Sequence, residues 1–292
     1  MLYAVNSRFS IFLLCKDFII FNINHSLITF FKMNSFEYGD LTTERRSRIL
    51  ELLEKEGRVF VKNLSDLFNV SEVTIRNDLD LLEKKNLLLR THGGALKIKR
   101  VGIDYHLSVK SKRHAAEKRA IGKKAAELIN DGETIILDSG TTTEEIAKNL
   151  GRFNDLTVIT NSLNVASQLI EFKNIRVIIP GGYLRRNSLS LIGSTAEESI
   201  KRYYCDKVFI GVDGIDSQHG ISTPNVEEAH LNNIMINISR EVIVVTDSSK
   251  FKQRSFAKIA PINKINTIIT DKNIPEDEKT NIENLGIKLI LV

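Results

Sequence analysis

The sequence predicts an α/β protein of two domains, in which a winged helix-turn-helix precedes a larger domain built on a mainly parallel sheet. Three observations support this prediction: a serine-capped amphipathic helix, a glycine-tipped basic hairpin directly after it, and a long alternation of short apolar runs with helical segments. With 292 residues, of which 42% are hydrophobic and 26% charged, the chain is long enough for two domains.

The N-terminal domain is expected between residues 40 and 97. Its first helix covers 44–56, where apolar residues recur on one face and Gly57 ends the last turn. Val59 and Val61 indicate a short strand. A second helix is expected at 62–68, and Asn69 interrupts it.

The next helix, at 72–84, is the candidate recognition helix because Ser71 supplies an N-cap that fixes where it starts. At about 100° per residue its buried face contains Ile75, Leu79 and Leu82. On or beside the opposite face are side chains that can reach phosphates or base edges when such a helix enters a major groove. These candidate DNA contacts are Ser71, Thr74, Arg76 and Asn77.

The segment 87–95 predicts the wing, a short hairpin whose tip is formed by Gly93 and Gly94. Arg90 and His92 are expected to project from it toward DNA. The alternative is a small three-helix domain whose polar helix face is only solvated.

From residue 115 onward the chain alternates strands and helices, which is typical of a parallel sheet covered by helices. Strands are expected at 134–137, 157–159, 175–179, 207–210, 242–245 and 267–269. Helices are expected at 115–129, 143–150, 163–170, 227–239 and 278–285. Ligands of such sheets bind beyond the carboxyl ends of the strands.

Polar and glycine residues gather at those strand ends, where amides, hydroxyls and cations can face an anion such as phosphate. The candidates are Asp138, Ser139, Gly140, Thr141, Thr142, Asn161, Gly181, Gly182, Arg185 and Lys250. Each turn on its own is also what an ordinary strand-to-helix connection needs. Four of them at successive strand ends favour a binding site.

A resemblance to a known family lies in two strings, VSEVTIRNDL at 70–79 and LRTHGGA at 89–95. Together they resemble the DNA-binding signature of the DeoR family of bacterial sugar-metabolism repressors. Residues 119–292 resemble the family's effector domain, whose fold is similar to ribose-5-phosphate isomerase and the coenzyme A transferases. The matching strings there include DSGTT at 138–142, TNS at 160–162, GVDGID at 211–216 and SKF at 249–251.

Three positions depart from the family pattern. Members usually carry an arginine where this chain has Asn77, often a lysine where it has Asn232, and commonly a glycine where it has Asn86.

The resemblance implies a cytoplasmic repressor of a sugar-utilisation operon, with operator DNA and a phosphorylated sugar as partners. It implies a homo-oligomer, either dimer or tetramer, without catalysis and without a cofactor. Residues 114–292 would then bind the effector through amides, hydroxyls and Lys250, and would also form the oligomer. Two alternatives remain: an isomerase in which Asp138 is the base and Lys250 stabilises an enediolate, or a second domain that only oligomerises.

Charge is concentrated just after the wing, since residues 97–124 carry ten basic and two acidic side chains. Such a cluster adds salt-dependent attraction to phosphates. A solvated linker, expected at 98–113, is the alternative for part of it. Cys15 and Cys205 are far apart and lack metal-ligand spacing, so no disulfide framework or metal site is expected.

The first 32 residues are apolar in part, but Lys16 and Asp17 interrupt the run, so no uninterrupted span for a bilayer exists there. A cleavage site of the secretory type is also missing. We expect Met33 to be the true start and residues 1–32 to be a non-native extension, with a weak membrane anchor as the alternative.

Overall fold

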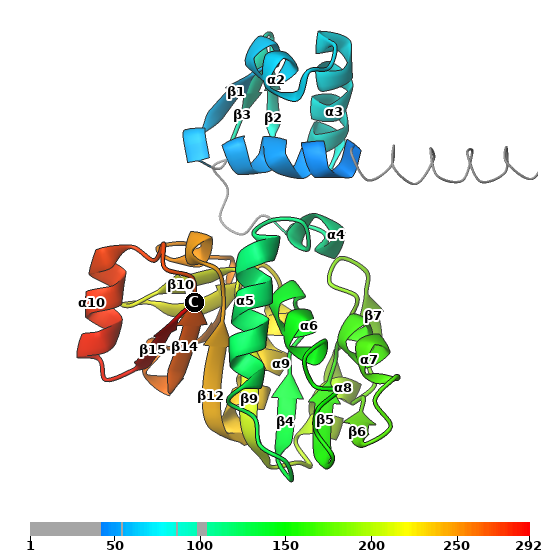
Figure 1. Ribbon diagram of the computed structural model, residues 1–292, viewed down its shortest axis with the longest axis vertical. Coiled ribbons are helices and arrows are strands. Elements are labelled where there is room, and N and C mark those ends of the chain that lie inside the picture. The colour runs from blue at the N-terminus through cyan, green and yellow to red at the C-terminus, as the bar shows by residue number, and fades with distance from the viewer. Residues whose placement is uncertain (1–41, 54, 86, 98–103) are drawn as a thin grey trace, which may run out of the picture.

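The computed structural model describes residues 42–53, 55–85, 87–97 and 104–292 (Figure 1). The expectations for Met33, for residues 1–32 and for Asn86 lie outside the described residues. In the part of the chain that the structure describes, no helix has the length and apolar character needed to cross a membrane.

The N-terminal domain has the predicted winged helix-turn-helix order. A helix runs through 42–53 and is followed by β1 (Arg58–Phe60), α2 (Val61–Phe68), α3 (Glu72–Lys84), β2 (Leu89–Thr91) and β3 (Gly94–Leu96). The three strands form an antiparallel sheet in the order β1-β3-β2. Its core includes Ile49, Leu53, Leu64, Ile75 and Leu79.

Two details of this domain follow from backbone geometry. Val61 opens α2 instead of ending the strand, which corrects the expected boundary by one residue. Gly94 is required because a Cβ there would lie 1.9 Å from the carbonyl oxygen of Val59 across the β1-β3 pair.

The larger domain has a seven-stranded parallel sheet in the order β15-β14-β12-β9-β4-β5-β6. The strands are β4 (Thr134–Leu137), β5 (Leu156–Thr160), β6 (Ile175–Ile178), β9 (Cys205–Ile210), β12 (Ser239–Val245), β14 (Thr267–Thr270) and β15 (Lys288–Leu291). All six predicted strands are present, and β15 is an additional one.

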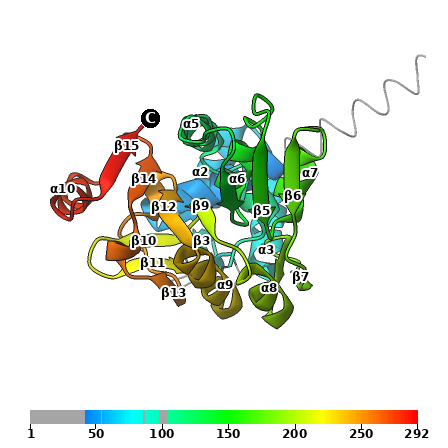
Figure 2. The same cartoon turned by 90° about the horizontal axis from the view of Figure 1, so that it is seen from below.

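Helices cover both faces of this sheet (Figure 2). On one face lie α5 (Ala115–Ala126), α6 (Thr141–Ala147) and α7 (Leu163–Leu169). The other face packs against α8 (Ser194–Ile200), α9 (Val226–Asn237) and a small antiparallel sheet of β10 (Gly214–Asp216), β11 (Gly220–Thr223) and β13 (Ala257–Ala260). Further elements are the hairpin of β7 (Tyr183–Arg185) and β8 (Ser190–Ile192), and α10 (Glu276–Asn284). Alternation along β4 sends Ile135 and Leu137 to one face and Ile136 to the other.

Part of the predicted linker is ordered structure. Residues 98–103 lie outside the described residues, but the chain from 104 to 113 contains α4 (Leu107–Lys110), which lies between the two domains (Figure 1). Tyr105 and Val109 pack against the core of the N-terminal domain, and the N–H of Leu107 donates to the carbonyl of Asn187, 2.8 Å away. The segment therefore contacts both domains.

Candidate DNA interface and effector site

The recognition helix α3 has the predicted start and the predicted faces. The Ser71 hydroxyl accepts from the N–H of Thr74 at 3.1 Å, as expected of an N-cap. Asn77 and Arg76 are exposed, and Arg76 pairs with Glu72 one turn away. The outward face is thus available for a groove.

A buried ion pair cluster ties α3 to the first helix. Asp78 is 1% exposed and accepts from the Nε atoms of Arg45 and Arg46, both at 2.6 Å. The sequence pattern does not predict this contact, because Asp78 is a charged residue between the exposed Asn77 and the buried Leu79, where either orientation fits the helix. It sets the angle between the two helices.

The wing is present, but the expectation that Arg90 projects from it is wrong. Its Nε donates to Asp80 on α3 at 2.8 Å, and its Nη1 donates to the carbonyl of Gly94 at 2.6 Å. Its own N–H donates to Glu83. Arg90 therefore joins the wing to the recognition helix, whereas His92 is exposed as expected.

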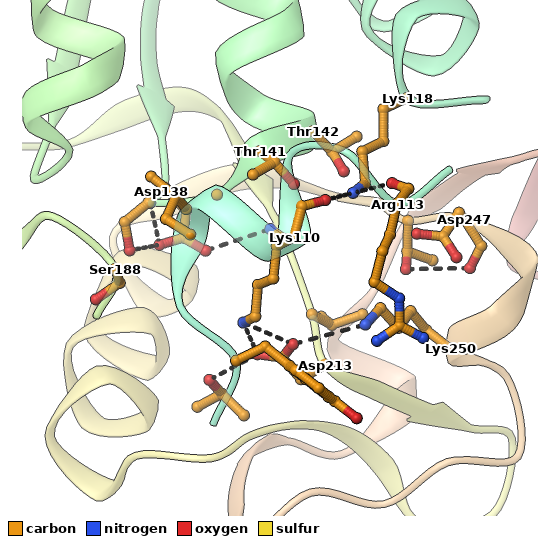
Figure 3. A pocket seen from close by; sticks show the side chains of 18 of the residues that line it. Lys110, Arg113, Lys118, Asp138, Thr141, Thr142, Ser188, Asp213, Asp247 and Lys250 are labelled. Atoms are coloured by element: carbon orange, nitrogen blue, oxygen red, sulfur yellow. Dashed lines mark hydrogen bonds and ion pairs between the residues drawn. The ribbon is translucent and has the colours of Figure 1, made fainter. Parts of the chain in front are cut away.

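A cavity of about 70 Å³ lies at the carboxyl ends of β4, β9 and β12, three neighbouring strands of the parallel sheet (Figure 3). It collects six of the ten predicted effector residues: Asp138, Ser139, Gly140, Thr141, Thr142 and Lys250. The Gly140 turn opens α6, and the Thr143 hydroxyl braces that turn by donating to the carbonyls of Asp138 and Gly140.

The other four predicted residues do not line the cavity. Asn161 donates to the carbonyl of Leu191. Gly181 and Gly182 have positive φ, and a Cβ at Gly182 would lie 2.4 Å from the carbonyl oxygen of Ile192, so these glycines serve local packing. Arg185 does not line the cavity and donates to Asp104 and to Glu228, a residue that does line it.

The cavity contains cations that the sequence analysis did not assign to it. Lys110 of α4, Arg113 of the turn after it and Lys118 of the first turn of α5 all line it, together with the His114 imidazole. The basic excess of residues 97–124 is the sequence feature that points to these residues, but on its own it favours a segment that faces DNA or solvent. Instead, segment 104–118 folds over the carboxyl ends of the strands, and these side chains therefore face the cavity.

Asp213 anchors α4 to the cavity floor. Its carboxylate lies 2.7 Å from Nζ of Lys110 and 3.7 Å from Nζ of Lys250, and Thr223 also donates to it. Burial by itself raises the pKa of Asp213, but the two ammonium groups outweigh burial and hold it at about 2. Asp213 is therefore charged at any physiological pH.

Lys118 is buried at the other side of the cavity. Its Nζ donates to the carbonyls of Lys110 and Arg113, the latter at 2.6 Å, and so holds the turn after α4 against α5. Burial lowers the pKa of Lys118 to about 8, although Asp247 opposes this. The charges of Lys250, His114 and Lys118 more than offset burial at Asp247 and lower its pKa.

Asp138 has the opposite environment. Burial, and then the charge of Glu228, raise its pKa to about 8. Hydrogen bonds from Ser139 and from the N–H of Gly211 work against this rise without cancelling it. Asn232 also donates to Asp138, at 3.2 Å.

The described residues contain no group of three or more His, Cys, Asp or Glu side chains placed to hold a metal ion. Cys205 is a free, buried thiol within this part of the chain.

Comparison with known families matches both domains. The DeoR C terminal sensor domain matches residues 113–272, and the DeoR-like helix-turn-helix domain matches residues 45–101. Residues 102–112, which contain α4, lie between the two matches.

Named relatives align with most of the chain. A protein named for repression of the aga operon in Escherichia coli O157:H7 is 44% identical over 253 residues, which cover 86% of this chain and 94% of the relative. The transcriptional repressor GlcR of Bacillus subtilis is 38% identical, over 78% of this chain and 88% of its own. The glycerol-3-phosphate regulon repressor of Escherichia coli K12 is 35% identical, over 80% and 92%.

Among solved structures, ribose 5-phosphate isomerase A of Methanocaldococcus jannaschii is 18% identical with a TM-score of 0.36, covering 47% of this chain and 55% of the other. Translation initiation factor eIF-2B of Pyrococcus horikoshii is 17% identical with a TM-score of 0.36, covering 73% and 74%.

Proposed function

Because this chain belongs to the DeoR family of DNA-binding transcriptional regulators, we propose that it represses a sugar-utilisation operon and leaves the operator when a phosphorylated sugar binds. The cation-rich cavity at the strand ends is the observation that carries the proposal. The related repressors are named as regulators and not as enzymes. The chain is likewise a regulator, so Asp138 and Lys250 serve binding.

The phosphate is assigned to the side of the cavity where positive charge and hydroxyl donors meet. Lys118, Arg113 and Lys250 lie on that side, with Thr141 and Thr142 beside them (Figure 3). A dianion there gains charge-assisted hydrogen bonds and relieves the repulsion that Lys250 and Arg113 exert on Lys118. A neutral sugar offers neither gain.

Segment 104–118 is proposed to carry the signal to the DNA-binding domain. Lys110 and Lys118 in this segment face the cavity, while Tyr105 and Val109 contact the winged-helix core. A ligand that draws Lys110 or Lys118 toward a phosphate must move the backbone between them, since Lys118 is bonded to the carbonyls of residues 110 and 113. The winged helix then changes its position on DNA.

Two further assignments follow from this role. A homo-oligomer is proposed because two recognition helices on one operator bind two half-sites. A cytoplasmic location is proposed because an operator-bound regulator acts in the compartment that contains the DNA.

Thermal unfolding with a panel of ligands tests the proposal. A ligand that binds only the folded state raises the Tm, so some sugar phosphates should raise it, whereas the matching free sugars and inorganic phosphate at equal concentration should do so much less. Lys250→Ala should reduce the shift, and Lys264→Ala, an exposed lysine outside the cavity, should not. A panel in which no sugar phosphate raises the Tm would contradict the proposal.

A further inference from the structure

The carboxyl groups that line the cavity differ in their charged neighbours. Three of them have cations close by: Asp213 with Lys110, Glu228 with Arg185, and Asp247 with Lys118 and Lys250. Asp138 forms no ion pair with any residue that the structure describes, and its main charged neighbour is the carboxylate of Glu228. One carboxyl group in the cavity therefore lacks a positively charged partner among the described residues.

The hydrogen bonds around Asp138 are nevertheless those that suit an ionised carboxylate. One oxygen accepts from the N–H and hydroxyl of Ser139, and the other accepts from the N–H of Gly211 and from Nδ2 of Asn232. Donors on both oxygens favour the charged form. Only burial, at 1% exposure, and Glu228 oppose it.

Asn232, which is bonded to Asp138, has an unsatisfied acceptor at the same place. Its side chain is 4% exposed and lines the cavity, and its Oδ1 has no hydrogen-bond partner while its Nδ2 is bonded to Asp138. Leaving a buried amide oxygen unbonded costs on the order of 1–3 kcal/mol. A ligand group that donates a hydrogen bond here satisfies Oδ1 of Asn232, and a positive charge on that group gives Asp138 the charged partner it lacks.

Asp138, with Asn232 bonded to it, lies at a different end of the cavity from most of the cations. In Figure 3, Asp138 lies at one end, whereas Lys118, Arg113 and Lys250 lie toward the other, with Lys110 and Asp213 between them. This separation of charge fits a ligand that is an anion at one end and a cation at the other.

We propose that the effector is an amino-sugar phosphate, whose ammonium group binds Asp138 and Oδ1 of Asn232 while its phosphate binds the cationic end. This inference rests on the proposed function and narrows its ligand. Because burial and Glu228 raise the pKa of Asp138 to about 8, the ligand-free carboxyl holds a proton at neutral pH. A hydroxyl supplies only a hydrogen bond, whereas an ammonium group also supplies the positive charge that stabilises the ionised form of Asp138. N-acetylation removes the charge and so removes the advantage.

Isothermal titration of the full chain with matched ligands tests this inference. The probes are glucosamine 6-phosphate against glucose 6-phosphate, galactosamine 6-phosphate against galactose 6-phosphate, and the two N-acetylated amino-sugar phosphates. In at least one pair the amino form should bind about tenfold more tightly or better than both its hydroxyl and its N-acetyl partner, since an ion pair replaces a neutral hydrogen bond.

The variant Asp138→Asn keeps the size of the side chain and removes its charge, so the preference for the amino form should fall to about twofold or less. Asp277→Asn, an exposed carboxyl outside the cavity, should keep the full preference. Hydroxyl sugar phosphates that bind as tightly as their amino partners to the wild-type chain would overturn this inference and leave the proposed function standing. Failure of all six probes, together with every other sugar phosphate of the thermal panel, would overturn both.

Discussion

Asp138 shows how one buried carboxyl links ligand chemistry to stability. It is buried at the end of β4, where burial and Glu228 raise its pKa to about 8. In the unfolded chain the same carboxyl ionises near its ordinary value of 3.8. Between these two values the folded protein holds a proton that the unfolded chain has released.

The first prediction is that the contribution of Asp138 to the stability of the ligand-free protein falls as pH rises from about 4 to about 8. Asp138 contributes up to about a tenfold change in the unfolding equilibrium per pH unit in that range, because one proton is lost on unfolding. Asp138→Asn should therefore gain stability relative to wild type as pH rises. Denaturant unfolding at several pH values measures this, with Glu171→Gln, at an exposed carboxyl outside the cavity, as the control. Parallel curves for wild type and Asp138→Asn would count against the raised pKa.

Arg90 leads to a second prediction, since it joins the wing to α3. Arg90→Ala and Asp80→Ala should both weaken operator binding, and the double variant should be little worse than either single one, because both remove the same contact. Loss of the negative charge of Asp80 close to DNA should by itself strengthen operator binding. Weaker binding by Asp80→Ala would therefore show that the contact with Arg90 matters more than this charge. Asp66→Ala, an exposed acid on α2, is the control. Tighter operator binding by Asp80→Ala would show that Arg90 does not position the wing.

Asn77 leads to a third prediction, about sequence preference. It is exposed on the face of α3 opposite Ile75 and Leu79. An asparagine amide pairs with adenine N6 and N7, whereas arginine pairs with guanine O6 and N7, each worth about 1–3 kcal/mol of discrimination. Selection from randomised half-sites should give adenine at one position for wild type and guanine there for Asn77→Arg. Identical selected sequences would remove Asn77 from the groove.

Among the elements, the segment that contains α4 is proposed to couple the cavity to the DNA-binding domain. Val109 contacts the winged-helix core, while Lys110 next to it is bonded to Asp213 in the cavity. The fourth prediction concerns Val109→Ser. In this variant the effector should still raise the Tm, but it should weaken operator binding less than in wild type, by a few-fold or more. This size is expected because coupling free energies between two sites are commonly about 1–3 kcal/mol. Val226→Ser, an exposed valine of the larger domain, is the control. If the effector releases Val109→Ser from the operator as fully as it releases wild type, Val109 does not couple the two domains.

Local patterns were enough to predict most elements. Ser71 caps α3 as expected, and the apolar runs at 134–137 and 207–210 are both central strands. The sequence does not predict the hairpin of β7 and β8 or the short helix α4, because these short elements are largely exposed or half-buried and so lack the apolar run that marks β4.

The sequence predicts the part of the site whose residues are close together in the chain. Asp138 to Thr142 form one turn after one strand, so their grouping follows from the chain itself. Lys110 and Asp213 are 103 residues apart, and their contact depends on how segment 104–118 folds over the sheet. Arg185 was wrongly placed in the cavity because a charge near a strand end says nothing about which way the side chain turns.

In the molecule as a whole, the cavity and the recognition helix belong to different domains, and segment 104–118 contacts both. Among the described residues, this segment offers occupancy of the cavity a direct route to DNA binding, and the arrangement of subunits offers a second. A ligand can shift such an equilibrium by no more than its difference in affinity for the two states. Effector and operator should accordingly weaken each other's binding by the same factor.

The central claim is that a sugar phosphate in the cavity releases the operator. Fluorescence anisotropy of a labelled duplex, selected from randomised DNA, measures it directly when the full chain is titrated with and without the sugar phosphate that raises its Tm most. The account predicts that the ligand weakens operator binding by about tenfold or more, and that Lys250→Ala responds much less than Lys264→Ala. Superimposable binding curves for the wild-type chain, with and without a sugar phosphate that demonstrably binds, would contradict it.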